Sequence, residues 1–203
     1  MSLKYIDIDP QYNTFIFELD DVLLPAKDYD LQVYYLFANF IEYLNPKFCA
    51  TELVDFIKFR YASYGNVEMF ENLKNKFKIE DSYHQNLNLL FLNAKLPLKL
   101  LLYKNVLSLL QDIIINRKQI FILTPGNAEM QLNKLKQTEW NGVESCLKVY
   151  FEEEYETPKL KTALNNLIIE HKLSAEKTIM IGSSNDRQII AQSVGINYLI
   201  IQH

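Results

Sequence analysis

Cysteine, glycine and long apolar runs are scarce in this sequence of 203 residues, which holds two cysteines and five glycines. Cys49 and Cys146 lie far apart without CxxC spacing, which argues against a disulfide framework and against a cysteine-rich zinc site. We expect both to be reduced, buried core residues of a cytoplasmic protein. No apolar run reaches the roughly 18 residues that a membrane span needs, and the first 14 residues are polar, unlike a signal peptide. The sequence therefore predicts no membrane association.

An excess of positive charge is also absent. The formal net charge is −4, and the 21 lysines and arginines are dispersed along the chain. This gives no electrostatic reason to expect a nucleic acid as partner. Hydrophobic residues make up 49% of the chain, enough for a sizeable core, and the length fits one domain with a modest insertion.

Five short apolar segments have the composition of buried strands. They are rich in Ile, Val, Phe and Tyr and do not alternate with polar residues, which is typical of strands covered on both faces of a parallel sheet. Helical patterns lie between most of them. The alternation predicts an α/β fold with a doubly wound parallel sheet. The predicted strands are 14–17, 119–124, 147–151, 178–182 and 197–201, and the predicted helices are 106–115, 128–137, 158–173 and 186–195.

Residues 26–98 interrupt this alternation, because they contain four helical patterns and no convincing strand. We therefore predict an α/β core domain from residues 1–25 and 99–203, with an inserted all-helical domain at 26–98. Ligands of open α/β sheets bind at the carboxyl ends of the strands. An insertion that leaves from this edge is expected to form a cap over the site.

Short polar residues and glycines follow the predicted strands. Any one such group is typical of an ordinary loop, but four of them at the same sheet edge indicate a binding site. The groups are Glu18, Asp20 and Asp21 after the first strand, Thr124, Pro125 and Gly126 after the second, Thr157 and Pro158 beyond the third, and Gly182, Ser183, Asp186 and Arg187 after the fourth.

These four segments, in this order and spacing, resemble the motifs of the haloacid dehalogenase (HAD) superfamily, in its subclass with a helical cap. The resemblance covers nearly the whole chain. The segments are "FIFELDDVL", "FILTPGNAEMQLNKL", "ETPKLKTALNNLIIEHKLSAEKTIMIG" and "MIGSSNDRQIIAQSVGI". The resemblance implies a Rossmann-like core and Mg²⁺-dependent hydrolysis of a phosphorylated small molecule.

The resemblance also assigns roles to individual positions. Glu18 stands at the nucleophile, Asp20 at the general acid–base position, and Thr124 at a position that holds phosphoryl oxygens together with Pro125 and Gly126. A lysine of the third motif would offset transition-state charge. The nucleophile and the acids of the fourth motif would hold Mg²⁺, which makes Glu18, Asp20 and Asp186 the candidate metal ligands.

Most of these positions depart from the family pattern. Glu18 replaces an aspartate and moves the carboxylate by more than about 1 Å, which costs on the order of 100-fold in rate. Thr157 stands in the lysine position. Ser183 and Arg187 replace the two acids of the fourth motif. Lys159 and Asp186 are close enough in sequence to compensate if the loops shift by one or two residues.

The sequence therefore predicts a weakly active or inactive HAD-like protein that binds a phosphorylated small molecule or a protein partner. We hypothesise that the Arg187 guanidinium replaces Mg²⁺ and pairs with Asp20 or Glu18. Two alternatives stay open. One is an active Mg²⁺-dependent phosphatase of small phosphometabolites or nucleotides. The other is a protein-interaction module that uses the aromatic residues between Tyr29 and Tyr64.

Overall fold

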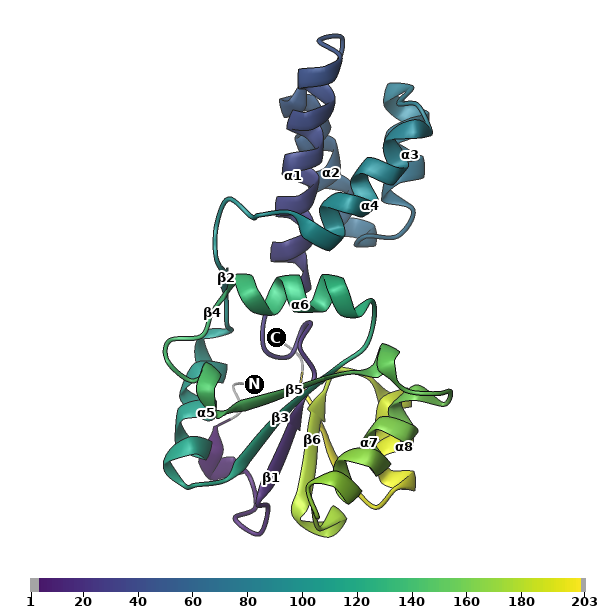
Figure 1. Cartoon of the computed structure of the whole chain (residues 1–203). Coiled ribbons are helices and arrows are strands. Elements are labelled where there is room, and N and C mark those ends of the chain that lie inside the picture. The colour runs from purple at the N-terminus through teal and green to yellow at the C-terminus, as the bar shows by residue number, and fades with distance from the viewer. Residues whose placement is uncertain (1–3, 202–203) are drawn as a thin grey trace. The chain divides into compact units, whose positions relative to one another are not determined.

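The computed structural model of the protein describes residues 4–201 and contains the predicted alternation of strands and helices (Figure 1). All five predicted strands are present, the last ending one residue early. The helices predicted at 106–115, 158–173 and 186–195 are present with shifted ends. The strands of the main sheet are β1 (Thr14–Phe17), β3 (Gln119–Thr124), β5 (Leu147–Phe151), β6 (Thr178–Gly182) and β7 (Asn197–Ile200), and the helices between them are α5 (Lys104–Ile115), α6 (Ala128–Gln137), α7 (Lys159–Glu170) and α8 (Asn185–Ser193).

The five strands form one parallel sheet in the order β5-β3-β1-β6-β7. β1 occupies the centre, with Phe17 in register with Ile122 of β3 and Ile181 of β6. All four β1 residues are buried, as expected for a strand covered on both faces. Because the strands are parallel, their carboxyl ends meet at a single edge, which confirms the predicted doubly wound α/β fold.

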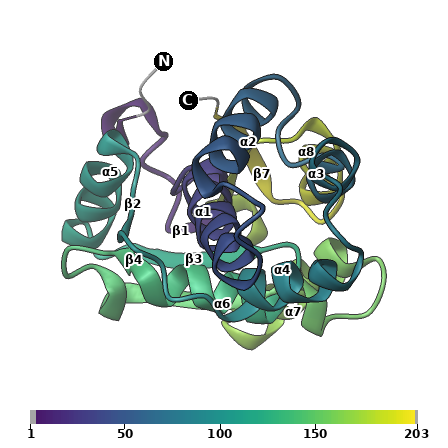
Figure 2. The same cartoon turned by 90° about the horizontal axis from the view of Figure 1, so that it is seen from above.

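Helices cover both faces of this sheet. Figures 1 and 2 show α5 on the opposite side of the strands from α7 and α8. One face is a core in which Ile16 and Met180 of the sheet are fully buried together with apolar residues of α7 and α8. Helix α8 ends at Ser193, and Gly195 follows with a positive φ of 80°, the left-handed conformation that glycine adopts readily after a helix.

The chain between β1 and the short strand β2 (Leu100–Leu101) forms four helices, α1 (Ala26–Leu44), α2 (Ala50–Tyr64), α3 (Met69–Phe77) and α4 (Ser82–Asn93). The structure divides into two compact units. The helical unit comprises Ala26–Leu100 with Asn133–Gln137, and the α/β unit comprises the described residues up to Pro25, Leu101–Leu132, and those from Thr138 onward. The last five residues of α6 thus group with the helices.

Inside the helical unit, α1 packs against both α2 and α4 (Figure 2). Tyr29 and Phe37 of α1 are fully buried there, while Tyr43 is 84% exposed and Phe59 of α2 is 76% exposed. The aromatic residues between Tyr29 and Tyr64 are therefore partly core and partly surface.

The connection after α4 is fixed to α6 by amide side chains. Gln137 accepts a hydrogen bond from the Leu96 N–H at 2.6 Å and donates to the Ala94 carbonyl at 2.8 Å. Asn133 donates to the same carbonyl at 3.0 Å. These bonds satisfy backbone groups of a segment that has no regular structure of its own.

Three features of the fold differ from the sequence analysis or add to it. The prediction of buried cysteines is wrong, because Cys49 and Cys146 are both exposed, although both are free thiols. The two-stranded pair of β2 and β4 (Thr138–Glu139) was not predicted, because strands of two residues carry no periodic pattern. Within residues 4–201, no helix combines the length and apolar character needed to cross a membrane.

Candidate functional site

The carboxyl ends of β1 and β6 bring Glu18, Ser183 and Arg187 together, although 165 residues separate Glu18 from Ser183. Glu18 continues β1, and its N–H bonds to the Ile181 carbonyl of β6 at 3.1 Å. Arg187 lies in the first turn of α8, which begins two residues after Ser183. The short connection from β6 to α8 therefore places Arg187 over the end of β1.

Both carboxylate oxygens of Glu18 accept hydrogen bonds. Oε1 accepts one from Arg187 Nε at 2.5 Å and one from the Tyr198 hydroxyl at 2.8 Å. Oε2 accepts longer bonds from the backbone N–H and hydroxyl of Ser183, at 3.3 and 3.4 Å. Glu18 is 4% exposed, so four protein donors replace water around this carboxylate.

Arg187 joins Glu18 to a second buried acid, Glu152, which directly follows β5. Its Nη1 donates to Glu152 Oε2 at 3.1 Å, and its Nη2 donates to the other carboxylate oxygen. Glu152 is 5% exposed. Burial alone lowers the pKa of Arg187, but the hydrogen bonds and charges of Glu152 and Glu18 outweigh it, so the pKa lies above its ordinary value. The guanidinium is therefore a permanent cation between two carboxylates.

Gly182 and Tyr198 fix the direction of the Glu18 side chain. A Cβ at Gly182 would lie 1.9 Å from the Tyr198 hydroxyl and 2.2 Å from Glu18 Oε1. Only glycine allows this close approach. Burial, followed by the charge and hydrogen bond of Glu18, raises the pKa of Tyr198, so the phenol stays protonated and keeps donating.

Asp20 lies outside this network, in the loop after β1. Its Oδ2 accepts a hydrogen bond from Gln131 Nε2 of α6 at 2.8 Å, and the same nitrogen donates to the Pro125 carbonyl at 2.9 Å. Asp21 adopts a left-handed conformation with φ 57°, and its N–H bonds to the Leu24 carbonyl at 2.8 Å. A tight turn therefore sets the position of Asp20.

Thr124, Pro125 and Gly126 form the loop between β3 and α6. Thr124 is fully buried, and its hydroxyl lies 3.4 Å from the Pro125 carbonyl. Gly126 has a φ of 91°, which favours glycine. Asn127 precedes the helix, and its Oδ1 accepts the Met130 N–H at 3.0 Å. The loop thus leads directly into a helix N-terminus, where backbone N–H groups and the helix dipole favour anions.

Three candidate residues stand apart from this cluster. Thr157 and Lys159 are exposed at the start of α7, and Asp186 is exposed on α8. Among residues 4–201, Lys159 and Asp186 form neither a hydrogen bond nor an ion pair with the acids of the site. In the described residues, neither side chain is therefore joined to Glu18, Asp20 or Glu152.

The donors at this edge do not suit Mg²⁺. The ion prefers octahedral oxygen ligands, usually including carboxylates, whereas both oxygens of Glu18 are engaged and a guanidinium lies beside them. In the part of the chain that the structure describes, no group of three His, Cys, Asp or Glu residues could hold a metal ion. The hypothesis that Arg187 pairs with Glu18 is confirmed, and Glu152, rather than Asp20, is its second partner.

Sequence reasoning missed Glu152 and Tyr198. Glu152 carried a usable signal, because it directly follows the third strand of the sequence pattern, just as Glu18 follows the first. The family pattern places its lysine further along the chain, at the position of Thr157. Tyr198 carried no signal, since a tyrosine within an apolar strand is typical of core packing.

Comparisons with known proteins agree with this architecture. A family model described as haloacid dehalogenase-like hydrolase matches residues 15–201. Similar solved structures include magnesium-bound YfnB of Bacillus subtilis (16% identity, TM-score 0.59, covering 94% of this chain and 86% of that one). They also include a haloacid dehalogenase-like family hydrolase of Xanthomonas campestris (15%, 0.55, 95% and 82%) and UTR4 of Saccharomyces cerevisiae (15%, 0.59, 93% and 90%). At these identities the likeness shows the fold alone. No curated protein matches the sequence.

Proposed function

Because the chain belongs to the haloacid dehalogenase-like hydrolase family, we propose that it binds a phosphorylated small molecule without hydrolysing it. In this proposal the family's metal-dependent centre is replaced by the ion network of Glu18, Arg187 and Glu152. The loop from Thr124 to the start of α6 is retained for the phosphate.

The observation that carries the proposal is the engagement of both Glu18 oxygens. A carboxylate that attacks phosphorus needs a free oxygen in line with the leaving group. Here Oε1 is held by Arg187 and Tyr198, and Oε2 is held by Ser183. Attack would first have to break an ion pair that is largely shielded from water. The network also contains two carboxylates and one guanidinium, so its formal charge is negative, like that of a phosphate.

Retention of the phosphate is supported by the other half of the site. Thr124 keeps a buried hydroxyl at the end of β3, and Gly126 lets the backbone approach a ligand closely. The first turn of α6 follows at once. A strand end that leads into a helix N-terminus is a common arrangement for anion binding in α/β proteins.

Two assays test the loss of catalysis. The purified protein is incubated with p-nitrophenyl phosphate and a panel of phosphometabolites with Mg²⁺, and Mg²⁺ binding is followed by isothermal titration calorimetry. We expect no turnover and no saturable Mg²⁺ binding. Mg²⁺-dependent turnover that Asp20→Asn abolishes would establish the alternative, an active phosphatase.

A restored variant provides the positive control. It carries Glu18→Asp, Thr157→Lys, Ser183→Asp and Arg187→Asp. The structure requires a fifth change, Glu152→Gln, because Arg187→Asp alone would leave Glu152 buried beside a second carboxylate without its cation. We expect this variant to gain Mg²⁺-dependent turnover.

Ligand binding is tested with the same phosphometabolite panel by calorimetry, comparing the wild type with Thr124→Val. This change keeps the shape of the side chain and removes the hydroxyl. We expect a panel member to bind the wild type and to bind Thr124→Val about tenfold more weakly, in line with the loss of one charge-assisted hydrogen bond. Absence of any phosphate-dependent binding would refute this half of the proposal.

A further inference from the structure

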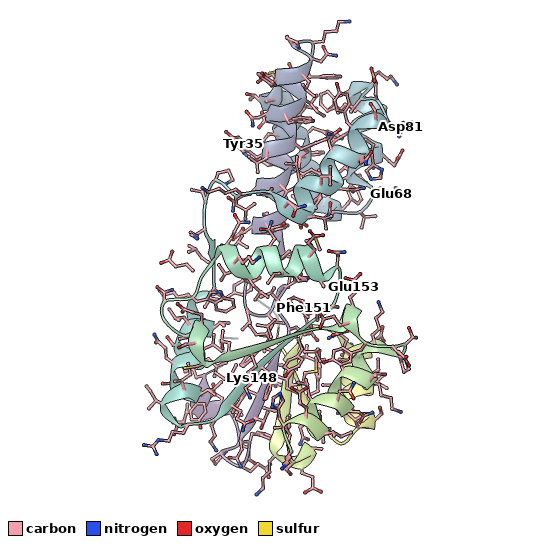
Figure 3. The ribbon with its side chains drawn as sticks, in the orientation of Figure 1. Tyr35, Glu68, Asp81, Lys148, Phe151 and Glu153 are labelled. Atoms are coloured by element: carbon pink, nitrogen blue, oxygen red, sulfur yellow. The ribbon has the colours of Figure 1, made fainter. Side chains whose placement is uncertain are left out.

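The short 3₁₀ helix η3 (Glu152–Glu154) directs two adjacent carboxylates to two different hydrogen-bond donors, a guanidinium and a helix N-terminal N–H. Glu152 is bound to Arg187, as described above. Glu153 turns the other way, and its Oε2 accepts a hydrogen bond from the Ala128 N–H at 2.6 Å. Figure 3 shows Glu153 beside the start of α6. The chain thus supplies its own anion to the helix N-terminus that follows the Thr124 loop.

This contact has the chemistry of a bound anion. The first N–H groups of a helix lack intrahelical partners, and the helix dipole favours negative charge there. Asn127 satisfies the Met130 N–H through its side chain, and Glu153 satisfies the Ala128 N–H. A phosphate that approaches this turn meets a carboxylate already in place, with the same sign of charge.

A second observation concerns Gln131, whose side-chain amide contacts the same loop at the Pro125 carbonyl. Gln131 is 2% exposed, and its Nε2 is used by Asp20 and the Pro125 carbonyl. Its Oε1 is buried and has no hydrogen-bond partner among the described residues. This oxygen needs a donor. A carboxylate is an acceptor only and cannot supply one.

We infer that Glu153 is an autoinhibitory contact, which a phosphate group bearing an O–H displaces from the start of α6. The phosphate oxygens take the Ala128 N–H, and the O–H donates to Gln131 Oε1. Glu152 stays bound to Arg187, so η3 keeps its place while the exposed Glu153 side chain swings out. The inference rests on the proposed function, because it describes how the same loop admits its ligand.

The test measures inorganic phosphate binding to the full chain by isothermal titration calorimetry. Glu153→Ala removes the competing anion, and Glu153→Gln removes only its charge. Glu154→Ala on the same 3₁₀ helix is the matched control, since Glu154 is also exposed and its side chain forms no hydrogen bond within residues 4–201. We expect Glu153→Ala to bind phosphate at least about fivefold more tightly than the wild type, from the loss of a like charge and a competing hydrogen bond at the helix terminus. Glu153→Gln should fall between them.

Unchanged affinity in Glu153→Ala, an equal gain in Glu154→Ala, or no phosphate binding in any variant would overturn the inference. Sulfate provides a further test, because at neutral pH it has the oxygens of phosphate without an O–H. Glu153→Ala should prefer phosphate over sulfate by about tenfold, since sulfate leaves Gln131 Oε1 unpaired; equal affinities would overturn the role of Gln131. Failure of the proposed function would be seen separately. It would appear as Mg²⁺-dependent turnover, or as an affinity for the phosphometabolites that Thr124→Val leaves unchanged.

Discussion

Replacing Arg187 by methionine tests the central feature of the site. The change preserves much of the side-chain volume and removes the only cation that contacts Glu18 and Glu152 among the described residues. Both acids are at most 5% exposed. Removing one partner of a buried ion pair costs about 3–5 kcal/mol, because the other charge stays buried without compensation. We expect a loss of this size in the free energy of unfolding.

The structure also predicts how this loss divides between the two acids. Glu18 keeps three donors after the change, from Tyr198 and Ser183. Glu152 loses both of the side-chain donors that the structure gives it. Adding Glu152→Gln to Arg187→Met should therefore recover about 2 kcal/mol, whereas adding Glu18→Gln should recover about 1 kcal/mol or less.

Urea denaturation followed by circular dichroism measures these differences. Arg117→Met is the control, since Arg117 is exposed and the change is chemically identical; its effect should stay within about 0.5 kcal/mol. If Arg187→Met cost less than about 1 kcal/mol, the value of an ordinary surface ion pair, the reasoning from burial would be refuted. Equal recovery by the two glutamine variants would refute the division between the acids.

Three further outcomes follow from the packing and the hydrogen bonds. Gly182→Ala should lower the free energy of unfolding by about 1–3 kcal/mol through overpacking against Tyr198 and Glu18, and an unchanged urea midpoint would contradict this contact. The Tyr198 hydroxyl has a raised pKa, first from burial and then from Glu18, so its contribution to stability is complete below the unfolded value of about 10 and is lost as the pH rises through the folded value. Tyr198→Phe should therefore lower the free energy of unfolding at pH 8, and this free energy should fall less steeply above about pH 10 than in the wild type. Identical pH profiles of the two proteins in urea denaturation would contradict the hydrogen bond. Gln137→Leu removes the acceptor of the Leu96 N–H and should speed hydrogen exchange at that amide by about fivefold; exchange at the wild-type rate would show that the bond contributes nothing.

The sheet and its order of elements could be predicted because each strand is short, apolar and bounded by polar residues. "TFIF" and "QIFILT" match β1 and β3 residue for residue. Helix ends were less predictable, since frayed ends and caps depend on local hydrogen bonds. The exposure of Cys49 could not be predicted from residue type, because cysteine usually prefers the core, whereas this residue lies at an exposed position just before α2.

Site residues could be predicted where a polar or charged side chain directly follows a strand of the sheet. Glu18, Thr124 and Arg187 lie close to β1, β3 and β6, and parallel topology alone brings such positions to one edge. The second partner of Arg187 was harder to predict than Glu18. Glu152 directly follows β5, but Asp20 is also a carboxylate near a strand end, and only the path of the chain decides between them. The role of Glu153 depends on a side-chain direction within a run of three glutamates, which no periodicity specifies.

The ion network also constrains the order in which mutations can accumulate. Glu18, Arg187 and Glu152 are each tolerable because of the others, so their effects are strongly epistatic. Glu18→Asp alone would draw the carboxylate away from Arg187, and Arg187→Asp alone would bring three acids together. A variant with a metal site at this position would therefore arise only through simultaneous changes or through destabilised intermediates. Substitutions at these three positions are therefore expected to be tolerated together rather than one at a time.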